Sequence, residues 1–226
     1  MSNFPQFDCK YCTYKINCIY EVLKEEEREL LNEKKVVKKY TKKETIYKEG
    51  RSATSCFFIL DGGVSLSKEI NVENPFFLVL KKSGSIIGLE SIGYNVTYNS
   101  TALCVSDTTC CTVTSSLMFH LIKNNKEACS FFSFQYNHFI NGLVCHLITL
   151  GTEKANVRIA RSLLTLFEIS KKASFNIKVN ELATMSSTTR ETTSRILASM
   201  KAMKMITITN RGINICDEQS LKDIYK

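Results

Sequence analysis

The sequence predicts an α+β fold in three parts: a small β-barrel or jelly roll, one long helix and a C-terminal winged helix-turn-helix. Three observations support this prediction. Many short strand-like runs separated by turn residues occupy the first half of the chain. A long apolar stretch without charged residues follows. Near the end, two helical segments with a tight connection precede an alternating hairpin. We expect the three parts to span residues 1–125, 126–152 and 153–226.

Positive charge is concentrated in the C-terminal part. The formal net charge is +8 over 226 residues, and residues 154–226 hold 13 Lys and Arg against 6 Asp and Glu. A basic domain beside a nearly neutral one suggests that only one half binds phosphates. No apolar run approaches the roughly 20 residues that span a bilayer, and the N-terminal residues do not resemble a signal peptide. We therefore expect a cytoplasmic protein without a membrane partner.

Three of the ten cysteines lie close together near the N-terminus. Cys9, Cys12 and Cys18 have the spacing Cys-x2-Cys-x5-Cys. Disulfides are rare in the cytosol, so clustered thiols indicate metal or redox use. Iron–sulfur clusters favour such tight runs together with a distant fourth cysteine, and zinc also accepts four thiolates. Chance clustering of thiols near a terminus is the alternative.

Short strands are predicted after a helix at about residues 19–32. They begin within residues 36–47, and Asp61-Gly62-Gly63 between two of them is a strong hairpin signal. Strands at such close spacing predict a small all-β barrel or jelly roll. Its predicted core contains Phe57, Phe58, Phe76 and Phe77. The clearest strand-like runs are residues 56–60, 64–70, 75–80, 101–105 and 110–114.

A short helix at residues 116–124 leads into the long helix, predicted over 126–152. The long helix has no acidic or basic residue between Glu127 and Glu153. So apolar a helix must be covered on most sides, by the barrel and by the same helix of a second subunit. A monomer with a central core helix is the alternative. The predicted dimer interface has seven residues on overlapping apolar stripes: Phe132, Tyr136, Phe139, Ile140, Leu143, Leu147 and Leu150.

Residues 188–200 have the pattern of a DNA-recognition helix. Arg190, Glu191, Ser194 and Arg195 share its solvent-facing side, because Arg190 and Ser194 are four residues apart, as are Glu191 and Arg195. Arginine can donate two hydrogen bonds to guanine, glutamate can accept from cytosine, and serine adapts to several bases. The alternative is a solvated amphipathic helix with an Arg/Glu ion pair.

The flanking segments complete a winged helix-turn-helix. A shorter helix at residues 179–185 and the connection Ser186-Ser187 precede the recognition helix. Alternation around Asn210-Arg211-Gly212 predicts a β-hairpin wing with Arg211 near its tip for phosphate contact. The remaining helices are predicted at residues 156–169 and 218–225.

Enzyme motifs are missing from the sequence. It contains no Gly-rich phosphate loop, no Cys-x-x-Cys in a βαβ setting and no Ser/His/Asp grouping. We therefore do not expect an enzyme. Two rivals to a DNA-binding regulator stay open: an iron–sulfur electron-transfer or redox protein, and a structural zinc protein that senses nothing.

The order of these parts resembles the Crp/Fnr family of transcription regulators over almost the whole chain. Glu181-Leu182-Ala183 and the segment 188–195 are similar to that family's DNA-reading signature. The resemblance implies that Thr189, Arg190, Glu191, Ser194 and Arg195 meet DNA. It also implies three partners: palindromic promoter DNA, RNA polymerase and a second copy of the chain. Ser187 departs from the family pattern, which usually has a turn glycine there, so the turn is expected to be strained.

Two branches of the family compete. Cyclic-nucleotide binders hold the phosphate with an arginine, but this chain has no arginine between Arg51 and Arg158. Residues 88–93 and the N-terminal cysteine spacing resemble the oxygen-sensing Fnr branch instead. That branch implies a [4Fe-4S] cluster on Cys9, Cys12, Cys18 and a late-strand cysteine. Cys111 is expected to be the fourth ligand, with Cys110 and Cys104 as weaker candidates.

The signal is expected to be nitric oxide or oxygen. The Fnr sensor has an acid in its dimer seam where this chain has Leu143, so a dimer is expected even without a cluster. The chain also resembles cysteine-bearing relatives that control nitrosative-stress genes such as that of the hybrid cluster protein. Some of those relatives bind haem, for which His120, His138 and His146 are the candidate ligands.

Overall fold

The computed structural model describes residues 8–14, 18–71, 74–93, 96–170, 174–210 and 212–224. The chain divides into two compact units. The first consists of residues 1–66 and 81–142, and the second of residues 67–80 and 143–226.

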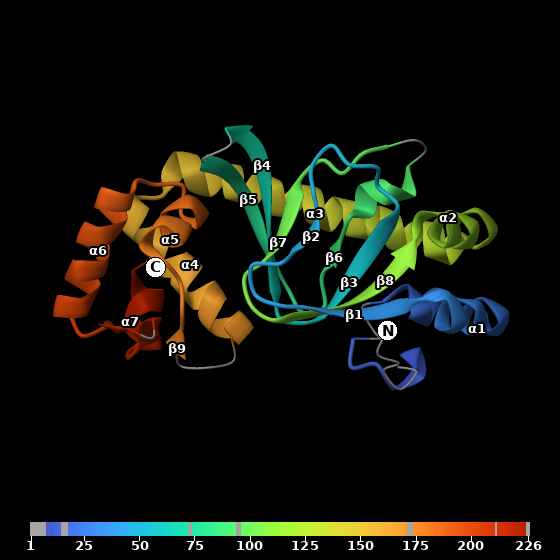
Figure 1. The fold of residues 1–226 in the computed structure, drawn as a ribbon, viewed down its shortest axis with the longest axis horizontal. Helices are drawn as coiled ribbons and strands as arrows, with labels where there is room; N and C mark the ends of the chain where they lie inside the picture. Colours follow the sequence, from blue (N-terminus) through green and yellow to red (C-terminus); the bar gives the residue numbers. More distant parts are fainter. Residues whose placement is uncertain are drawn as a thin grey trace. The chain divides into compact units, whose positions relative to one another are not determined.

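Two four-stranded sheets confirm the predicted β domain (Figure 1). The strand order is β1-β8-β3-β6 in one sheet and β2-β7-β4-β5 in the other. In the first sheet all neighbouring strands are antiparallel. The strands are β1 (Val36–Tyr40), β2 (Thr45–Tyr47), β3 (Ser55–Asp61), β4 (Gly63–Asn71), β5 (Asn74–Lys82), β6 (Ile86–Ile87), β7 (Thr101–Cys104) and β8 (Thr108–Thr114).

The predicted hairpin between β3 and β4 turns at Gly62. Its φ is +88°, and an added Cβ would lie 2.3 Å from the carbonyl oxygen of Asp107, so only glycine fits. Phe57, Phe58 and Phe77 are buried as predicted. The prediction for Phe76 is wrong, because this side chain is 38% exposed. Successive strand residues point to opposite faces, so burying Phe77 turns its neighbour toward solvent.

The helix predicted over residues 19–32 is divided in the structure. A 3₁₀ helix, Ile19–Val22, is followed by extended backbone at Leu23 and then by α1 (Glu25–Lys34). The break is stabilised by the Glu27 carboxylate, which accepts the Lys24 N–H at 2.8 Å and caps α1. The short helix α2 (Ser115–Asn124) begins within one residue of its predicted start.

The long helix α3 (Lys126–Thr152) has the predicted bounds. The Asn125 side chain caps it by accepting the Ala128 N–H at 3.1 Å. Early in the helix, Ala128 and Phe132 are buried in the core of the first unit. The core cluster also contains Ile19, Leu31, Cys56, Phe58, Cys111, Leu117, Met118 and Leu121.

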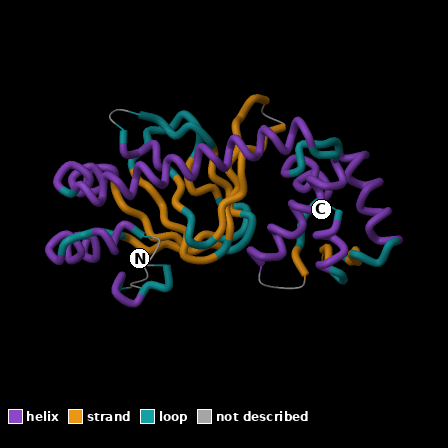
Figure 2. Tube along the Cα trace, turned by 180° about the vertical axis from the view of Figure 1, so that it is seen from behind, coloured by secondary structure: helices purple, strands orange, loops and turns teal. Residues whose placement is uncertain are grey.

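The second unit contains the predicted winged helix-turn-helix (Figure 2). A small sheet of order β10-β11-β9 packs beside its helices. The buried side chains of Leu163, Leu182, Leu197, Met200 and Ile213 form much of the core. The elements are α4 (Ala155–Ser170), β9 (Ser174–Phe175), α5 (Val179–Met185), α6 (Arg190–Ala202), β10 (Ile206–Thr209), β11 (Gly212–Ile215) and α7 (Glu218–Asp223).

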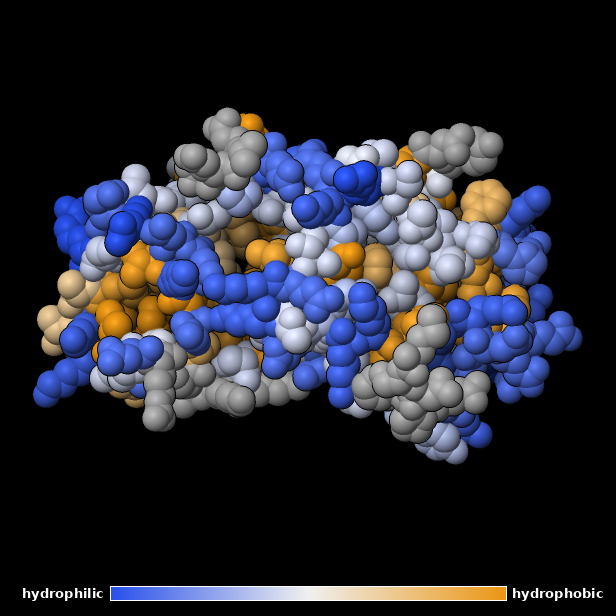
Figure 3. Space-filling view, viewed as in Figure 1, coloured by the Kyte–Doolittle hydropathy of each residue, from blue (hydrophilic) through white to orange (hydrophobic). Residues whose placement is uncertain are grey.

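The surface carries mainly polar side chains on the face seen in Figure 3, with smaller apolar areas between them. Among the helices that the structure describes, none combines the length and apolar character needed to cross a membrane.

Candidate metal centre and DNA-binding surface

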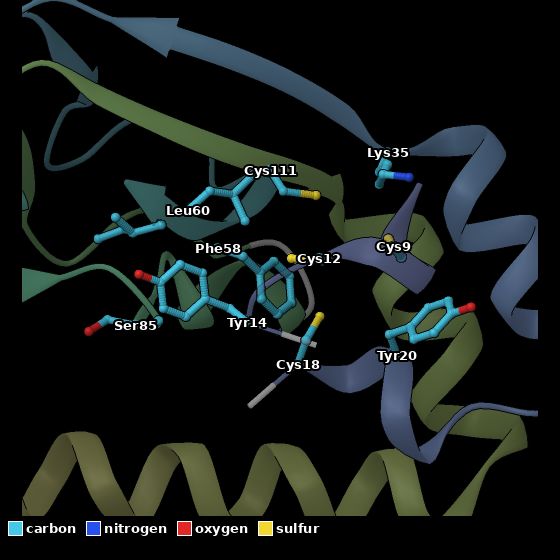
Figure 4. Close-up of a pocket in the computed structure, with 12 residues that line it drawn as sticks. Cys9, Cys12, Tyr14, Cys18, Tyr20, Lys35, Phe58, Leu60, Ser85 and Cys111 are labelled. Atoms are coloured by element: carbon cyan, nitrogen blue, oxygen red, sulfur yellow. The ribbon is translucent and has the colours of Figure 1, made fainter. Parts of the chain in front are cut away.

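Four cysteines predicted as cluster ligands line one pocket of the first unit (Figure 4). Cys9 belongs to a 3₁₀ helix, Cys9–Tyr11, and Cys12 ends that helix. Cys18 precedes the helix Ile19–Val22. Cys111 comes from β8, far away in the sequence. The fold therefore brings together the three thiols of the N-terminal segment, residues 8–18 without the undescribed 15–17 (the cysteine arm), and one strand thiol.

Asn32 of α1 attaches the cysteine arm to the β domain. Its side-chain NH₂ donates to the Asp8 carboxylate at 3.0 Å, and its side-chain oxygen accepts the Cys9 N–H at 3.0 Å. The Asp8 carboxylate also accepts the Lys10 N–H at 2.9 Å and caps the 3₁₀ helix. These bonds involve no metal, so the arm is positioned by the polypeptide itself.

Strand register separates the three candidates for the fourth ligand. Cys111 pairs with Phe58 and lines the pocket, whereas neither Cys110 nor Cys104 lines it. Cys110 pairs with Ile59, and its side chain points to the opposite face because strand residues alternate. Burial raises the pKa of Cys110, and the charge of the nearby Cys104 raises it further. Of the three, Cys111 is the one that faces the arm.

Burial governs the ionisation of the pocket thiols. It raises the pKa of Cys18 to about 12 and raises the pKa of Cys111 well above its ordinary value. Burial also raises the pKa of Cys9, where the Lys35 ammonium acts in the opposite direction. Without a metal these three thiols are protonated at neutral pH, and a bound metal must displace their protons.

Four cysteines are a donor set that either a [4Fe-4S] cluster or a zinc ion accepts. In the described part of the chain, no three His, Cys, Asp or Glu side chains are grouped closely enough for one metal ion. The pocket volume is about 30 Å³, room for about one water molecule. A cluster would therefore require the arm to move outward.

The three histidines considered for haem do not share a site. His120 and His138 are exposed on different helices. His146 packs its ring edge-on against Phe77 and lines a second pocket of about 170 Å³. That volume is below the roughly 300 Å³ at which small-molecule pockets usually begin. None of the three lines the cysteine pocket.

Aromatic rings occupy the β domain beside the turn at residues 88–93. Tyr47 and Tyr98 stack with ring centroids 4.0 Å apart. The Tyr98 hydroxyl donates to the Ser55 carbonyl at 2.8 Å and accepts the Ser55 N–H at 3.2 Å, which fixes the ring in place. Arg51 lies beside these rings, since its carbonyl accepts the Tyr98 N–H at 2.9 Å.

Helix α6 carries the predicted base-reading residues on its exposed side. It begins after Thr189, whose side-chain oxygen accepts the Thr192 N–H at 3.2 Å as an N-cap. On the opposite side, Leu197 and Met200 are buried. The residues predicted to meet DNA are all exposed: Thr189, Arg190, Glu191, Ser194 and Arg195.

Arg158 holds the turn of the helix-turn-helix, a role that sequence reasoning missed. Its guanidinium donates to the carbonyls of Glu153, Ser186 and Ser187 at 2.6, 2.9 and 3.1 Å. Ser187 has a φ of +47°, which supports the expected strain at this position. Arg158 shares a polar side of α4 with Arg161, Ser162 and Thr165, so its position in the sequence does not identify its partners.

The predicted wing is present as β10 and β11, which pair antiparallel. Gly212 at the start of β11 has a φ of +134°, and an added Cβ would lie 2.3 Å from the Phe175 carbonyl oxygen. Arg211, predicted to contact phosphate, lies outside the described residues.

The predicted dimer residues lie on two sides of α3. Phe132 is buried in the core of its own chain, and the Tyr136 hydroxyl donates to the Leu89 carbonyl at 2.5 Å. The Lys81 ammonium lies 4.9 Å from the centroid of the Phe139 ring. Phe132 is therefore not available to a partner. Leu143 and Leu150 are half-buried, and the exposed apolar side chains nearby are Ile140, Val144, Leu147 and Ile148.

Comparison with protein families assigns both halves of the chain. Residues 37–125 match the model of the cyclic nucleotide-binding domain, and residues 157–224 match that of the Crp-like helix-turn-helix domain. No curated protein sequence matches the chain.

Solved structures share the fold at low sequence identity. A protein of Eubacterium rectale described as a Crp/Fnr-family transcriptional regulator has a TM-score of 0.78 at 14% identity, covering 91% of this chain and 96% of its own. A CRP-family transcriptional regulator of Thermus thermophilus, TTHB099, has a TM-score of 0.70 at 21% identity, with coverages of 83% and 95%. FixK2 of Bradyrhizobium japonicum has a TM-score of 0.68 at 18% identity, with coverages of 84% and 96%.

The two matching domains, their order and the helix between them agree with the structure described above. The chain belongs to the Crp/Fnr family of DNA-binding transcription regulators.

Proposed function

We propose that the protein is a dimeric transcription regulator that senses nitric oxide or oxygen through a [4Fe-4S] cluster on Cys9, Cys12, Cys18 and Cys111. One observation carries the proposal: three arm thiols and one strand thiol line the same pocket. When bound, such a cluster supplies a soft, gas-reactive iron centre whose stability depends on its surroundings. The four side chains hold it, and Asn32 orients the arm that carries three of them.

Packed side chains join the pocket to the long helix. Cys111, Met118 and Phe132 belong to one core cluster of the first unit. Tyr136, one turn after Phe132, is hydrogen-bonded to Leu89 of the same cluster. A shift of the arm against β8 therefore changes the packing around the first half of α3. In this way a change at the cysteine pocket can alter the balance between two conformations of the protein.

The exposed apolar stripe of α3 supports the proposed homodimer. Ile140, Val144, Leu147 and Ile148 recur at the three- and four-residue spacing of a helix–helix seam. The half-buried Leu143 places no charge beside this stripe, so the subunits are expected to associate with or without a cluster. Size-exclusion chromatography of cluster-free protein should show a dimer, and a monomer alone would contradict this part of the proposal.

The exposed side of α6 is proposed to read base edges in the major groove. Arg190, Glu191, Ser194 and Arg195 supply donors and acceptors suited to different bases. A two-fold dimer would read a palindromic promoter whose half-sites lie about one helical turn apart, with RNA polymerase as the further partner that the family resemblance implies.

Anaerobic reconstitution tests the sensor. Wild-type protein should take up iron and sulfide, gain a broad absorbance near about 400 nm, and change its affinity for operator DNA after exposure to nitric oxide or oxygen. Cys12→Ala and Cys111→Ala should lose both the absorbance and the response. Cys104→Ala is the matched control, because Cys104 is a buried strand thiol outside the pocket. Colourless, zinc-loaded wild-type protein would favour the structural zinc function instead.

A further inference from the structure

One charged side chain borders the four-cysteine pocket. Lys35 lines it together with Cys9, Cys12, Cys18 and Cys111 (Figure 4). It is the C-cap residue of α1, and its backbone N–H donates to the Leu31 carbonyl at 3.0 Å. Lys35 is half-buried at the end of the helix, so its side chain has less freedom than that of an exposed lysine.

The ammonium of Lys35 is directed by Asn32. It donates to the Asn32 carbonyl at 3.3 Å and also to the side-chain oxygen of Asn32. That same oxygen accepts the Cys9 N–H at 3.0 Å. Burial raises the pKa of both Cys9 and Cys111, and the Lys35 charge acts in the opposite direction on both thiols. One cation is thus held between the arm and the strand that supply the thiols.

One carboxylate of the arm acts against Lys35. Asp8 accepts hydrogen bonds from the Asn32 side-chain amide and the Lys10 N–H, and its charge raises the pKa of Cys9, a smaller effect than the lowering by Lys35. Glu33 and Lys34 pair with each other at 2.9 Å on the exposed side of α1. Lys35 is the charged side chain among the described residues that line the pocket.

We propose that Lys35 is a charge-compensating residue of the four-cysteine site, which raises the reduction potential of an iron–sulfur cluster bound there. This inference rests on the proposed function. Four thiolates gather negative charge, and reduction adds more, so a fixed cation beside the sulfurs favours the reduced form. Net charge and hydrogen bonds to the sulfurs are two of the factors that set cluster potentials. Lys35 supplies the charge, and Asn32 is its positioning residue.

Redox titration of reconstituted protein with dithionite, which delivers one electron to the cluster, tests this role. Lys35→Met removes the charge at similar length and should lower the midpoint potential. At a fixed potential, we expect about a tenfold smaller ratio of reduced to oxidised cluster, or about 59 mV for one electron. Lys35→Arg keeps the charge and should stay close to wild type. Lys34→Met is the matched control: it removes a neighbouring lysine charge that does not line the pocket, so its potential should be unchanged.

The outcomes separate this inference from the proposed function. If Lys35→Met carries a full cluster with wild-type potential, the inference is wrong and the proposed function stands. An equal shift in Lys34→Met would also overturn it, because the effect would then report net charge alone. If Lys35→Met folds but holds no cluster while Lys35→Arg does, the need for the charge is upheld. Lys35→Gln replaces Lys35→Met should the latter fail to fold. If wild-type protein takes up no iron, both proposals fail.

Discussion

The four-cysteine pocket and the recognition surface of α6 are built in different ways. The pocket joins an N-terminal arm to strand β8 and depends on buried thiols. The proposed recognition surface comes from one continuous segment, in which the side chains proposed to read bases are all exposed. A site of the first kind depends on long-range contacts, whereas one of the second kind depends on helix periodicity. Local sequence patterns therefore identify the second kind more completely than the first.

The turn before α6 shows that a site of the second kind can also depend on a long-range contact. Arg158→Met should destabilise the second unit by about 2 kcal/mol, because carbonyls of Glu153, Ser186 and Ser187 lose a charged donor. Urea denaturation measures the loss. Arg161→Met is the matched control on the same helix; its ion pair with Glu153 is partly exposed and should contribute less than about 1 kcal/mol. Equal losses would show that the turn does not depend on Arg158.

Arg195 tests whether the exposed side of α6 reads bases. Arg195→Ala should weaken binding to the specific operator by about 1–3 kcal/mol and leave binding to random DNA nearly unchanged. Fluorescence anisotropy at fixed salt compares the two DNAs. Lys201→Ala, at the C-terminal end of the same helix, should weaken both to a similar and smaller extent. Equal losses on both DNAs for Arg195→Ala would remove its role in base reading.

Asn32 tests whether the arm is positioned without metal. Asn32→Ala removes the hydrogen bonds to Asp8 and Cys9, each contributing about 1 kcal/mol, and should release the arm from α1. Hydrogen exchange at the Cys9 amide of metal-free protein should become faster, while exchange in β3 and β8 should not change. Unchanged protection at Cys9 would mean that other contacts hold the arm.

Ser187 tests the strain in the turn. Ser187→Gly should stabilise the second unit by about 0.5 kcal/mol, since glycine relieves a left-handed backbone but loses more chain entropy on folding. Thermal denaturation with Ser186→Gly as control distinguishes strain relief from a general effect, because Ser186 has an ordinary negative φ of −98°. A lower melting temperature for Ser187→Gly would show that the serine side chain matters more than the strain.

His146 gives the smallest expected effect. Burial lowers its pKa below the ordinary value, and the nearby Arg158 charge acts in the same direction. The unfolded chain therefore binds more protons than the folded chain once the pH falls to the usual histidine pKa of about 6.5, so folding stability decreases as the pH falls further. His146→Gln should make stability less dependent on pH between about 7 and 5.

Sequence patterns predicted the bounds of the helices better than they predicted which residues are in contact. The bounds of α3 and α5 agree with the prediction because each has clear ends and a continuous helical pattern. Phe132 and Leu147 both fit an apolar stripe, but only the fold shows that Phe132 faces its own core and that Leu147 is exposed. Periodicity distinguishes apolar from polar sides, but it does not distinguish a core from a partner surface.

The candidate sites show the same limit. Cys9, Cys12 and Cys18 were visible from their spacing, and Cys111 from the family resemblance. Lys35 and Arg158 were not identifiable, because each acts through contacts that only the folded chain creates. Lysine and arginine are frequent in this chain, with 30 of the two together, so residue type alone does not single them out.

Burial divides the four pocket thiols into two groups of different reactivity. Cys9 and Cys111 are buried, whereas Cys12 and Cys18 are partly exposed. Buried protonated thiols react slowly with oxidants, so damage by oxidants should fall first on the partly exposed pair.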